Sequence, residues 1–140
     1  MILISHRGNL NGKSMYENNP EYVQEALSQD FYVEIDVWWT DNEYWLGHDN
    51  PQYPVDGHYL ENPKLWCHAK NIEALSNMSK SKIHCFWHQN DDVTLTSHGY
   101  LWTYPNKQLT EMSICVLPEI QKVDFSGCVG ICSDYIKKYR

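Results

Sequence analysis

The sequence predicts an α/β fold, a reduced (β/α)₈ barrel in which several outer helices are missing or shortened. First, about eight short segments are apolar almost throughout, as expected for parallel strands that are covered on both faces. Second, polar residues follow directly after several of these segments, where α/β folds place their chemistry. Third, only two connections have the length and periodicity of a helix, and a full barrel takes about 250 residues, whereas this chain has 140.

Composition and charge limit the domain organisation and the partners. A hydrophobic content of 42% in 140 residues is enough for one domain, residues 1–140, with a real core. Eighteen acidic and eleven basic residues give a net charge of −7. This charge argues against binding of nucleic acid by bulk electrostatics and against attachment to an anionic membrane surface. We therefore expect any phosphate site to be local.

Cysteine usage and the N-terminal segment predict a cytoplasmic protein. The five cysteines are an odd number scattered singly along apparent strands, which favours reduced core thiols over a disulfide framework. The apolar start, Met1–Ile4, ends at Ser5 and is too short for a signal peptide or a spanning helix. We therefore predict no membrane span.

The first elements form a predicted β-α-β unit. Residues 2–4 are a short buried strand that leads into Ser5-His6-Arg7-Gly8, where Gly8 permits a tight turn. A helix is expected over about residues 20–29, because Asn19 is a good N-cap, Pro20 suits the first helical position, and apolar residues recur at helical spacing. The next strand covers 32–38. The two strands should be parallel neighbours.

The remaining chain repeats the pattern of an apolar run followed by polar residues. Tyr44–Leu46 is a strand that ends in Gly47-His48-Asp49, and Pro51–Pro63 is predicted to be loop because of its prolines. Leu65–Lys70 is another strand, and Asn71 caps a helix through about residue 79. Further strands are expected at 83–87, at 93–104 as a strand or hairpin turning near His98-Gly99, at 113–117 and at 129–132.

Two acidic residues interrupt the strand Val33-Glu34-Ile35-Asp36-Val37-Trp38. Strand side chains alternate between faces, so Glu34 and Asp36 point to the same side, roughly 6.6 Å apart along the backbone at about 3.3 Å per residue. In an apolar neighbourhood two such charges repel each other unless a cation lies between them. The pair therefore predicts a divalent metal or a cluster of Arg, Lys and His; the alternative is an edge strand with a solvated polar face.

Four motifs then occur in order and at compact spacing: Ser5-His6-Arg7-Gly8, Glu17-Asn18, Glu34-Ile35-Asp36-Val37 and Gly47-His48-Asp49. This series resembles the glycerophosphodiester phosphodiesterase family, which belongs to the broader phosphatidylinositol-phospholipase-C-like phosphodiesterases. The resemblance covers the first fifty residues well. Beyond them it is limited to Lys70 and to Gly130–Asp134, which looks like the family's closing Gly-Ile-x-Thr-Asp.

The resemblance implies a TIM-type barrel and hydrolysis of a small-molecule, glycerophosphodiester-like substrate. By motif, His6 and His48 would be the catalytic acid and base, and Arg7 and Lys70 would bind the phosphate. Two histidines that titrate near neutrality suit the two proton transfers of this reaction. A hydroxyl next to the ester, as in glycerol, would attack first and give a cyclic phosphate. Such an enzyme would belong to lipid metabolism.

The resemblance also implies a divalent cation held by Glu34, Asp36 and Glu17. Oxygen ligands suit Mg²⁺ or Ca²⁺, and Mn²⁺ is a further candidate ion. The family's fourth strand presents Glu-x-Lys, whereas this chain has His68-Ala69-Lys70. One carboxylate is therefore missing, and Glu17, His68 or water must complete the coordination.

The same residues also allow other interpretations. The missing carboxylate favours a non-catalytic phosphate- or ligand-binding module that keeps the barrel rim. Each polar side chain also has a structural interpretation, as a capping or solvated group. Strands left uncovered by helices would expose apolar surface, which a homodimer would cover. A structural zinc site is a further alternative, although adjacent residues of a strand point to opposite faces, which suits tetrahedral coordination poorly; its ligands would be Cys67, His68, Cys85 and His88.

Overall fold

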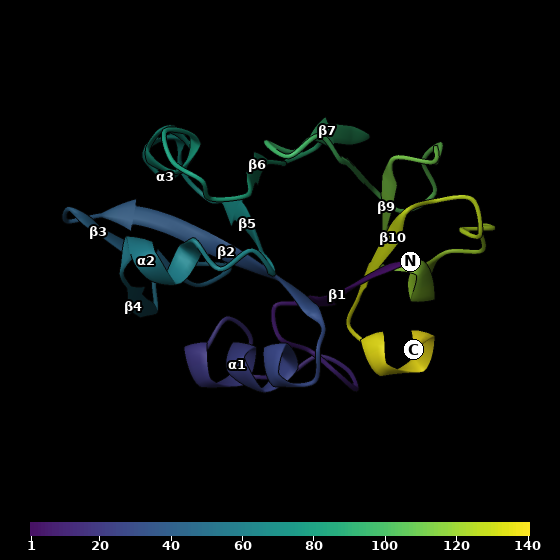
Figure 1. Ribbon diagram of the computed structural model, residues 1–140, viewed down its shortest axis with the longest axis horizontal. Helices are drawn as coiled ribbons and strands as arrows, with labels where there is room; N and C mark the ends of the chain where they lie inside the picture. The colour runs from purple at the N-terminus through teal and green to yellow at the C-terminus, as the bar shows by residue number, and fades with distance from the viewer.

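Ten strands form one mixed sheet that curls into a half-barrel in the computed structural model, which describes residues 1–140 (Figure 1). The strands are β1 (Ile2–His6), β2 (Tyr32–Thr40), β3 (Glu43–Leu46), β4 (Tyr53–Val55), β5 (Leu65–Ala69), β6 (Cys85–Trp87), β7 (Val93–Leu95), β8 (Leu101–Thr103), β9 (Ser113–Val116) and β10 (Gly130–Ser133). The helices are α1 (Pro20–Ser28), α2 (Gly57–Leu60) and α3 (Ile72–Ser79), and the 3₁₀ helices are η1 (Pro118–Ile120) and η2 (Ile136–Tyr139).

The centre of the sheet is parallel and its additions are antiparallel. β1 lies between β2 and β10, β5 pairs with the other edge of β2, and β6, β9 and β8 continue the parallel arrangement on the two sides. β3 and β4 extend β2 as an antiparallel meander, and β7 and β8 form a hairpin. No ladder joins β6 to β7 or β8, so the sheet stays open there.

The prediction of a reduced (β/α)₈ barrel is wrong, because strands and loops replace the helices between strands. The connection from β2 to β5 contains the β3–β4 meander and the one-turn helix α2, and the connection from β6 to β8 contains β7. Residues 104–112 and 117–129 connect the last strands without an α-helix. Apolar side chains from these two connections pack against the core in place of outer helices; they are Leu109, Val123 and Phe125.

Most of the individual elements were nevertheless predicted correctly. Each expected apolar segment contains a strand, and residues 93–104 do form a hairpin. β1, α1 and β2 form the expected unit with parallel neighbouring strands. The Asn19 side chain caps α1 by accepting a hydrogen bond from the Glu21 amide at 2.9 Å. The loop prediction for Pro51–Pro63 is wrong, because β4 and α2 lie within it.

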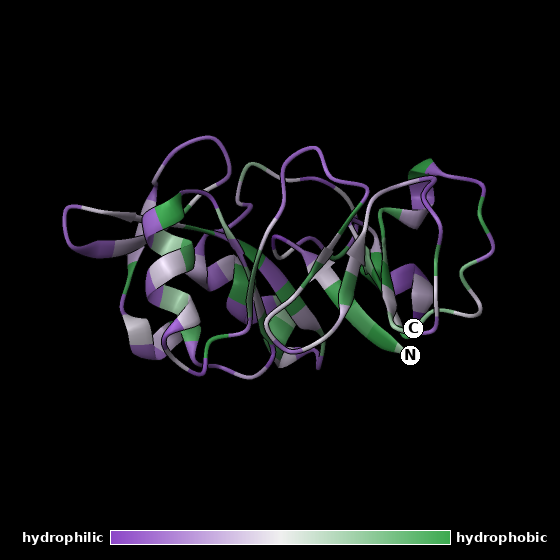
Figure 2. Ribbon diagram, turned by 90° about the horizontal axis from the view of Figure 1, so that it is seen from above, coloured by the Kyte–Doolittle hydropathy of each residue, from purple (hydrophilic) through white to green (hydrophobic).

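Alternation along the strands separates an outer core from an inner one. The outer core lies between the sheet and the elements that cover it, and α1 contributes Val23 and Ala26 to it. Figure 2 shows apolar residues concentrated in the strands and polar ones in the connections. The inner core fills the concave side of the sheet and is rich in aromatic rings; it consists of Ile4, Trp66, Phe86, Trp102, Ile114, Val116 and Cys132. Within β2 the inner face instead carries the two buried carboxylates, Glu34 and Asp36.

All five cysteines are buried and have free thiols. Cys67 and Cys85 belong to the outer core, whereas His68 and His88 line a cavity on the inner side. Burial raises the pKa of the Cys67 thiol well above its ordinary value. The zinc-site alternative therefore fails on geometry, because its thiols and its imidazoles lie on opposite faces of the sheet.

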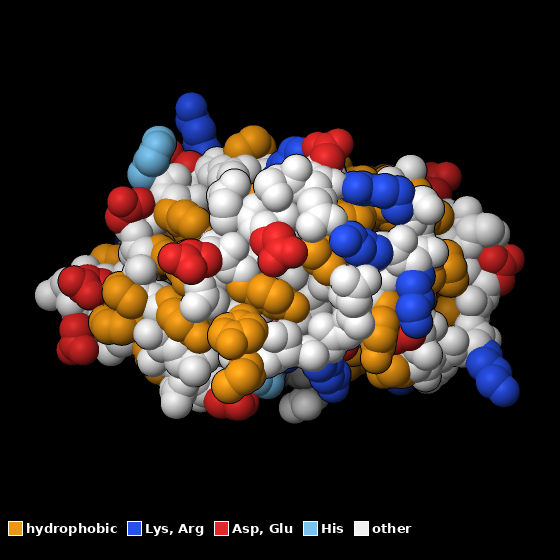
Figure 3. Space-filling model, turned by 90° about the horizontal axis from the view of Figure 1, so that it is seen from below, with side chains coloured by type: hydrophobic (Ala, Val, Ile, Leu, Met, Phe, Trp, Pro, Cys, Tyr) orange, Lys and Arg blue, Asp and Glu red, His pale blue; other side chains and the backbone are white.

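The molecular surface is uneven in charge. Figure 3 shows one face on which lysine and arginine side chains gather on the right half, while acidic ones are more common on the left. The 3₁₀ helix η2 and the residue after it contribute three of the chain's bases, Lys137, Lys138 and Arg140. None of the helices combines the length and the apolar character that crossing a membrane requires. The homodimer stays a prediction.

Acid is expected to destabilise the fold through His84, which lies buried just before β6. Its Nε2 contacts Thr96 Oγ1 at 2.8 Å, and its ring packs against Trp66 and His98. Burial, followed by repulsion from His98, lowers the pKa of His84 to about 3. In the unfolded chain a histidine binds its proton near pH 6.5, so between about pH 6.5 and pH 3 the unfolded state binds more protons and stability falls as the pH falls.

Urea unfolding across this pH range will measure the effect, with His84→Phe as the comparison. Phenylalanine keeps the ring contacts but cannot take up a proton, and Thr96 Oγ1 still accepts a hydrogen bond from the Tyr100 amide. The wild type should lose more stability than the variant on acidification. Parallel pH curves for the two proteins would contradict the assignment.

Candidate functional site

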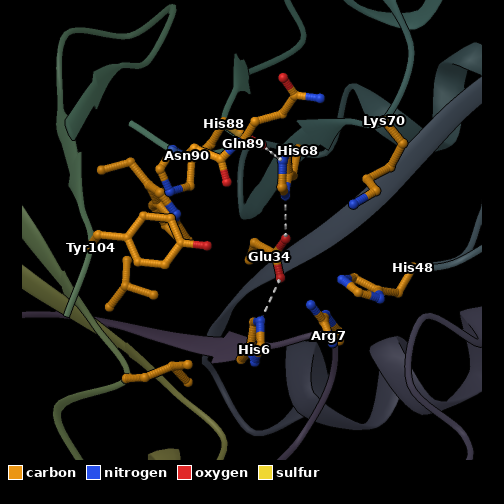
Figure 4. Close-up of a pocket in the computed structure, with 13 residues that line it drawn as sticks. His6, Arg7, Glu34, His48, His68, Lys70, His88, Gln89, Asn90 and Tyr104 are labelled. Atoms are coloured by element: carbon orange, nitrogen blue, oxygen red, sulfur yellow. Dashed lines mark hydrogen bonds and ion pairs between the residues drawn. The ribbon is translucent and has the colours of Figure 1, made fainter. Parts of the chain in front are cut away.

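A cavity of about 380 Å³ opens at the carboxyl ends of the parallel strands. His6 from β1, Glu34 from β2 and His68 from β5 line it together with Arg7 and His48. Figure 4 shows these side chains and Lys70 directed toward one common space. The opposite wall consists of amide, aromatic and aliphatic side chains; they are His88, Gln89, Asn90, Trp102, Tyr104, Val116 and Leu117. The structure thus brings predicted residues from the first seventy positions to one place.

Glu34, Asp36 and His68 form a tight group at the wall of this cavity, which Glu34 and His68 line. Asp36 lies opposite His68 in the β2–β5 register, and Glu34 is two residues away on the same face. One ligand atom from each of the three lies within 4.8 Å of the others. His68 Nδ1 is 3.3 Å from Asp36 Oδ1 and 3.7 Å from Glu34 Oε1. The predicted convergence of the two carboxylates is therefore present.

Two oxygens of this group are buried without a hydrogen-bond partner, namely Glu34 Oε2 and Asp36 Oδ1. Glu34 is 1% exposed and Asp36 0%. Buried carboxylate oxygens that accept no hydrogen bond are costly, and native proteins satisfy them with donors or cations. Asp36 Oδ1 faces His68 Nδ1 at 3.3 Å, whereas Glu34 Oε2 faces His6 Nε2 at 3.8 Å. Glu34, Asp36 and His68 are therefore the residues that could hold a divalent cation.

Opposing influences set the charge states within the group. Burial works to raise the pKa of Asp36, but His68, Arg7 and Asn18 outweigh it and hold this pKa well below its ordinary value. Burial likewise works to lower the pKa of His68, yet the hydrogen-bonding and charge of Asp36 and Glu34 raise it to about 9. In the protein alone, the His68 imidazolium therefore neutralises part of the carboxylate charge.

Asp134 orients the imidazole of His6. β10 pairs with β1, which places Asp134 beside the end of β1, and its Oδ1 lies 2.7 Å from His6 Nδ1. The other ring nitrogen, Nε2, faces the cavity at 3.8 Å from Glu34 Oε2. Burial works to lower the pKa of His6, but the hydrogen bond to Asp134 and the charge of Glu34 outweigh it, so this pKa is raised.

His48 also has an aspartate at Nδ1, its chain neighbour Asp49, but this carboxylate lies on the surface. Its Nδ1 lies 2.8 Å from Asp49 Oδ1, and its side chain is 43% exposed. The turn that presents it requires glycine at position 47, where φ is +153° and an added Cβ would lie 2.0 Å from the Asn50 carbonyl oxygen. The Gly47 carbonyl in turn accepts a hydrogen bond from Trp38 Nε1 at 2.6 Å.

Arg7 lies between Asp36 and Glu17 and contacts both carboxylates. Its Nε is 3.1 Å from Asp36 Oδ2, and its Nη1 donates to Glu17 Oε2 at 3.2 Å. Glu17 also accepts a hydrogen bond from Asn9 at 2.9 Å. Glu17 therefore binds Arg7 and Asn9 and lies outside the group formed by Glu34 and Asp36. His68, and not Glu17, is the third member of that group.

The sequence interpretation assigned no role to three polar residues that support the site: Asn9, Asn18 and Asp134. Asn9 Nδ2 also donates to Asp134 Oδ1 at 2.8 Å, which fixes the partner of His6. Asn18 Nδ2 donates to Asp36 Oδ2 at 2.9 Å, and its Oδ1 accepts from the Asp36 amide at 2.8 Å. Asp134 carried the same signal as the other site residues, since it follows an apolar strand directly. Asn9 lies in a polar loop without such a signal, whereas Asn18 belongs to the Glu17-Asn18 motif of the resemblance, which gave it no role.

Replacing Asn18 should destabilise the protein by about 1–3 kcal/mol, because the Asp36 amide and one carboxylate oxygen lose buried partners. Asn18 has φ +66°, so Asn18→Gly removes the side chain without backbone strain and Asn18→Ala adds that strain. Chemical denaturation of both variants measures the loss. We expect both to be destabilised and Ala more than Gly. Stability equal to wild type in the glycine variant would contradict the structural role.

Comparison of the chain with protein-family models, with curated proteins and with solved structures found no match. The functional assignment therefore depends on the chemistry of the site and on the motif resemblance alone.

Proposed function

We propose that this protein is a metal-dependent phosphodiester hydrolase acting on a glycerophosphodiester-like substrate. One observation carries the proposal: His6 and His48, each bound at Nδ1 by an aspartate, line the same cavity as Glu34, whose buried carboxylate has an unpartnered oxygen. The motif resemblance to the glycerophosphodiester phosphodiesterase family supports the same activity. Either feature alone would fit many proteins, but the combination suits a reaction that needs two proton transfers and charge neutralisation.

Glu34, Asp36 and His68 would hold the cation. When bound, a divalent ion polarises a nonbridging phosphoryl oxygen and offsets developing negative charge. Arg7 and Lys70 extend positive charge along the same cavity wall and would contact the other nonbridging oxygen. The chain as a whole is negative, so these two side chains provide the local attraction for a phosphate.

His6 and His48 would move the protons. The substrate hydroxyl next to the ester attacks phosphorus and passes its proton to one imidazole Nε2, while the other imidazole protonates the departing alcohol oxygen as its bond to phosphorus breaks. The product of this step is a cyclic phosphate and a free alcohol. In a second step water opens the cyclic phosphate, and the two histidines exchange roles. Binding of Nδ1 by Asp134 and Asp49 leaves Nε2 of each ring for this work.

A second cavity, of about 420 Å³, shares Arg7 and His48 with the first. Apart from Met15 its other walls are polar, and they include Lys13, Ser14 and Gln52. A phosphodiester carries two alcohol groups, so a phosphate bound at Arg7 would place one group in each cavity. This arrangement supports a diester substrate over a monoester.

Hydrolysis assays with glycerophosphodiesters and a bis-aryl phosphodiester, each with Mg²⁺, Ca²⁺, Mn²⁺, Co²⁺ or Zn²⁺, will test the proposal. We expect metal-dependent release of the alcohol, and phosphorus NMR should detect the cyclic phosphate with substrates that carry a neighbouring hydroxyl. If no substrate is cleaved with any ion while glycerol phosphate still binds, the protein is a phosphate-binding module and the catalytic proposal fails.

A further inference from the structure

The donor set of the Glu34–Asp36–His68 group differs from one made only of oxygens. Two carboxylates and one imidazole face each other, and the ligand atoms lie within 4.8 Å. Carboxylate, carbonyl and water ligands suit Mg²⁺ and Ca²⁺, whereas an imidazole nitrogen favours ions of the transition series such as Co²⁺ and Zn²⁺. The identity of the third donor therefore decides which class of ion the site prefers.

Hydrogen bonding determines which nitrogen of His68 faces the carboxylates. His68 Nε2 lies 2.9 Å from the backbone carbonyl oxygen of His88, and a carbonyl only accepts hydrogen bonds. Nε2 must therefore carry a hydrogen, which leaves the Nδ1 lone pair of the neutral ring directed at Glu34 and Asp36. A ligating histidine whose other nitrogen donates to a backbone carbonyl is the usual arrangement at metal sites in proteins.

The ring of His68 is also held in place by packing. It stacks on Phe86 with ring centroids 5.2 Å apart and an interplanar angle of 13°. Phe86 belongs to the inner core, so the imidazole is fixed from below by that ring and at its far edge by the His88 carbonyl. Such prior orientation reduces the entropy lost when a ligand binds an ion.

We propose that His68 Nδ1 is the third protein ligand of this site, and that the chain therefore binds a transition-series divalent ion, of the Co²⁺ and Zn²⁺ class, in preference to Mg²⁺ and Ca²⁺. This inference rests on the metal part of the proposed function and names the ion class that the site selects. Glu34 and Asp36 supply oxygen ligands: Glu34 Oε1 lies 3.7 Å from His68 Nδ1, and Asp36 Oδ1, which is buried without a hydrogen-bond partner, lies 3.3 Å from it.

Titration of the chelator-treated full-length protein with Co²⁺, followed by visible absorption, will measure affinity, with Mg²⁺ and Ca²⁺ as competitors. The variant His68→Glu replaces the nitrogen donor by a carboxylate, and His68→Gln removes the imidazole ligand. The matched control is His58→Gln, which removes a histidine whose side chain is 93% exposed. The wild type and His58→Gln should bind Co²⁺ more tightly than Mg²⁺ or Ca²⁺. Each His68 variant should lose Co²⁺ affinity by at least about tenfold, and His68→Glu should gain affinity for Ca²⁺ or Mg²⁺.

Pulsed electron paramagnetic resonance of the wild-type Mn²⁺ complex provides a test that requires no variant to fold. A histidine ligand gives ¹⁴N coupling to the ion, so absence of this coupling from the wild-type complex would overturn the inference. An unchanged order of ion affinities in a folded His68→Glu variant would also overturn it. Neither readout depends on turnover. Nitrogen coupling without hydrolysis of any diester would refute the proposed function alone, and hydrolysis without nitrogen coupling would refute the ion assignment alone.

Discussion

Replacing His6 by alanine is expected to lower the turnover of a cleaved glycerophosphodiester by about 10²–10⁴-fold, the usual contribution of one general acid or base. His6 Nε2 faces the cavity, and no other imidazole is held by Asp134. His48→Ala should cause a loss of the same order, because the reaction needs both an acid and a base. The measurement is kcat with saturating metal and substrate.

His58→Ala is the matched control, since it removes a histidine that lies on the surface in α2. It should retain wild-type turnover. The fold should survive in His6→Ala, because Asp134 keeps its hydrogen bond from Asn9. Circular dichroism will verify this. Turnover of His6→Ala within a few-fold of the wild type would remove His6 from the mechanism.

Asp134→Asn separates positioning from chemistry at the same imidazole. Asp134 contacts no substrate in the proposed reaction and acts through His6 Nδ1. The variant should lower kcat with little change in KM, and the pH at which His6 titrates in the rate profile should fall, because the carboxylate contributes to the raised pKa of His6. A purely structural role for Asp134 would leave that pH unchanged.

Replacing Trp66 by alanine is expected to lower the free energy of unfolding by about 3–5 kcal/mol. Trp66 is 2% exposed and packs against three other rings of the concave side, those of His84, Tyr100 and Trp102. The neighbouring rings are rigid and cannot refill the volume of an indole by small shifts, so we expect a cavity to remain. Domains are typically stable by about 5–15 kcal/mol, so this single change should remove a large part of the total.

Urea unfolding of three variants will check this prediction. Trp66→Phe keeps an aromatic ring in the inner core and should lose less than Trp66→Ala. Met15→Ala removes an 85% exposed apolar side chain and should change stability by less than about 0.5 kcal/mol. If Trp66→Ala were as stable as Met15→Ala, the inner core would not support the half-barrel.

Local pattern accounts for the elements that the sequence predicted correctly. Continuous apolar runs mark β1, β5, β9 and β10 because these strands are covered on both faces, and Asn19 with Pro20 marks the start of α1 through backbone chemistry within a few residues. The same local rule places Glu34 and Asp36 on one face of β2. These features depend only on residues that are neighbours in the chain, so they can be predicted from the sequence.

The predicted barrel failed for a reason that is not local. An apolar strand has the same pattern whether a helix, a hairpin or a loop follows it, and the long connections of this chain cover the outer core with Leu109, Val123 and Phe125 in place of helices. β4 was missed because Tyr53–Val55 is short and contains a proline, which is tolerated in a strand that pairs on one side only.

Residue types and strand periodicity alone identified two same-sided carboxylates and the histidines at the ends of apolar segments. Which groups meet was decided by strand pairing between distant parts of the chain: β5 beside β2 brings His68, and not Glu17, to the carboxylates, and β10 beside β1 brings Asp134 to His6. Side-chain direction repeats every two residues and can be predicted from the order of residues. Contact across a sheet depends on register, which forms only when the whole chain folds.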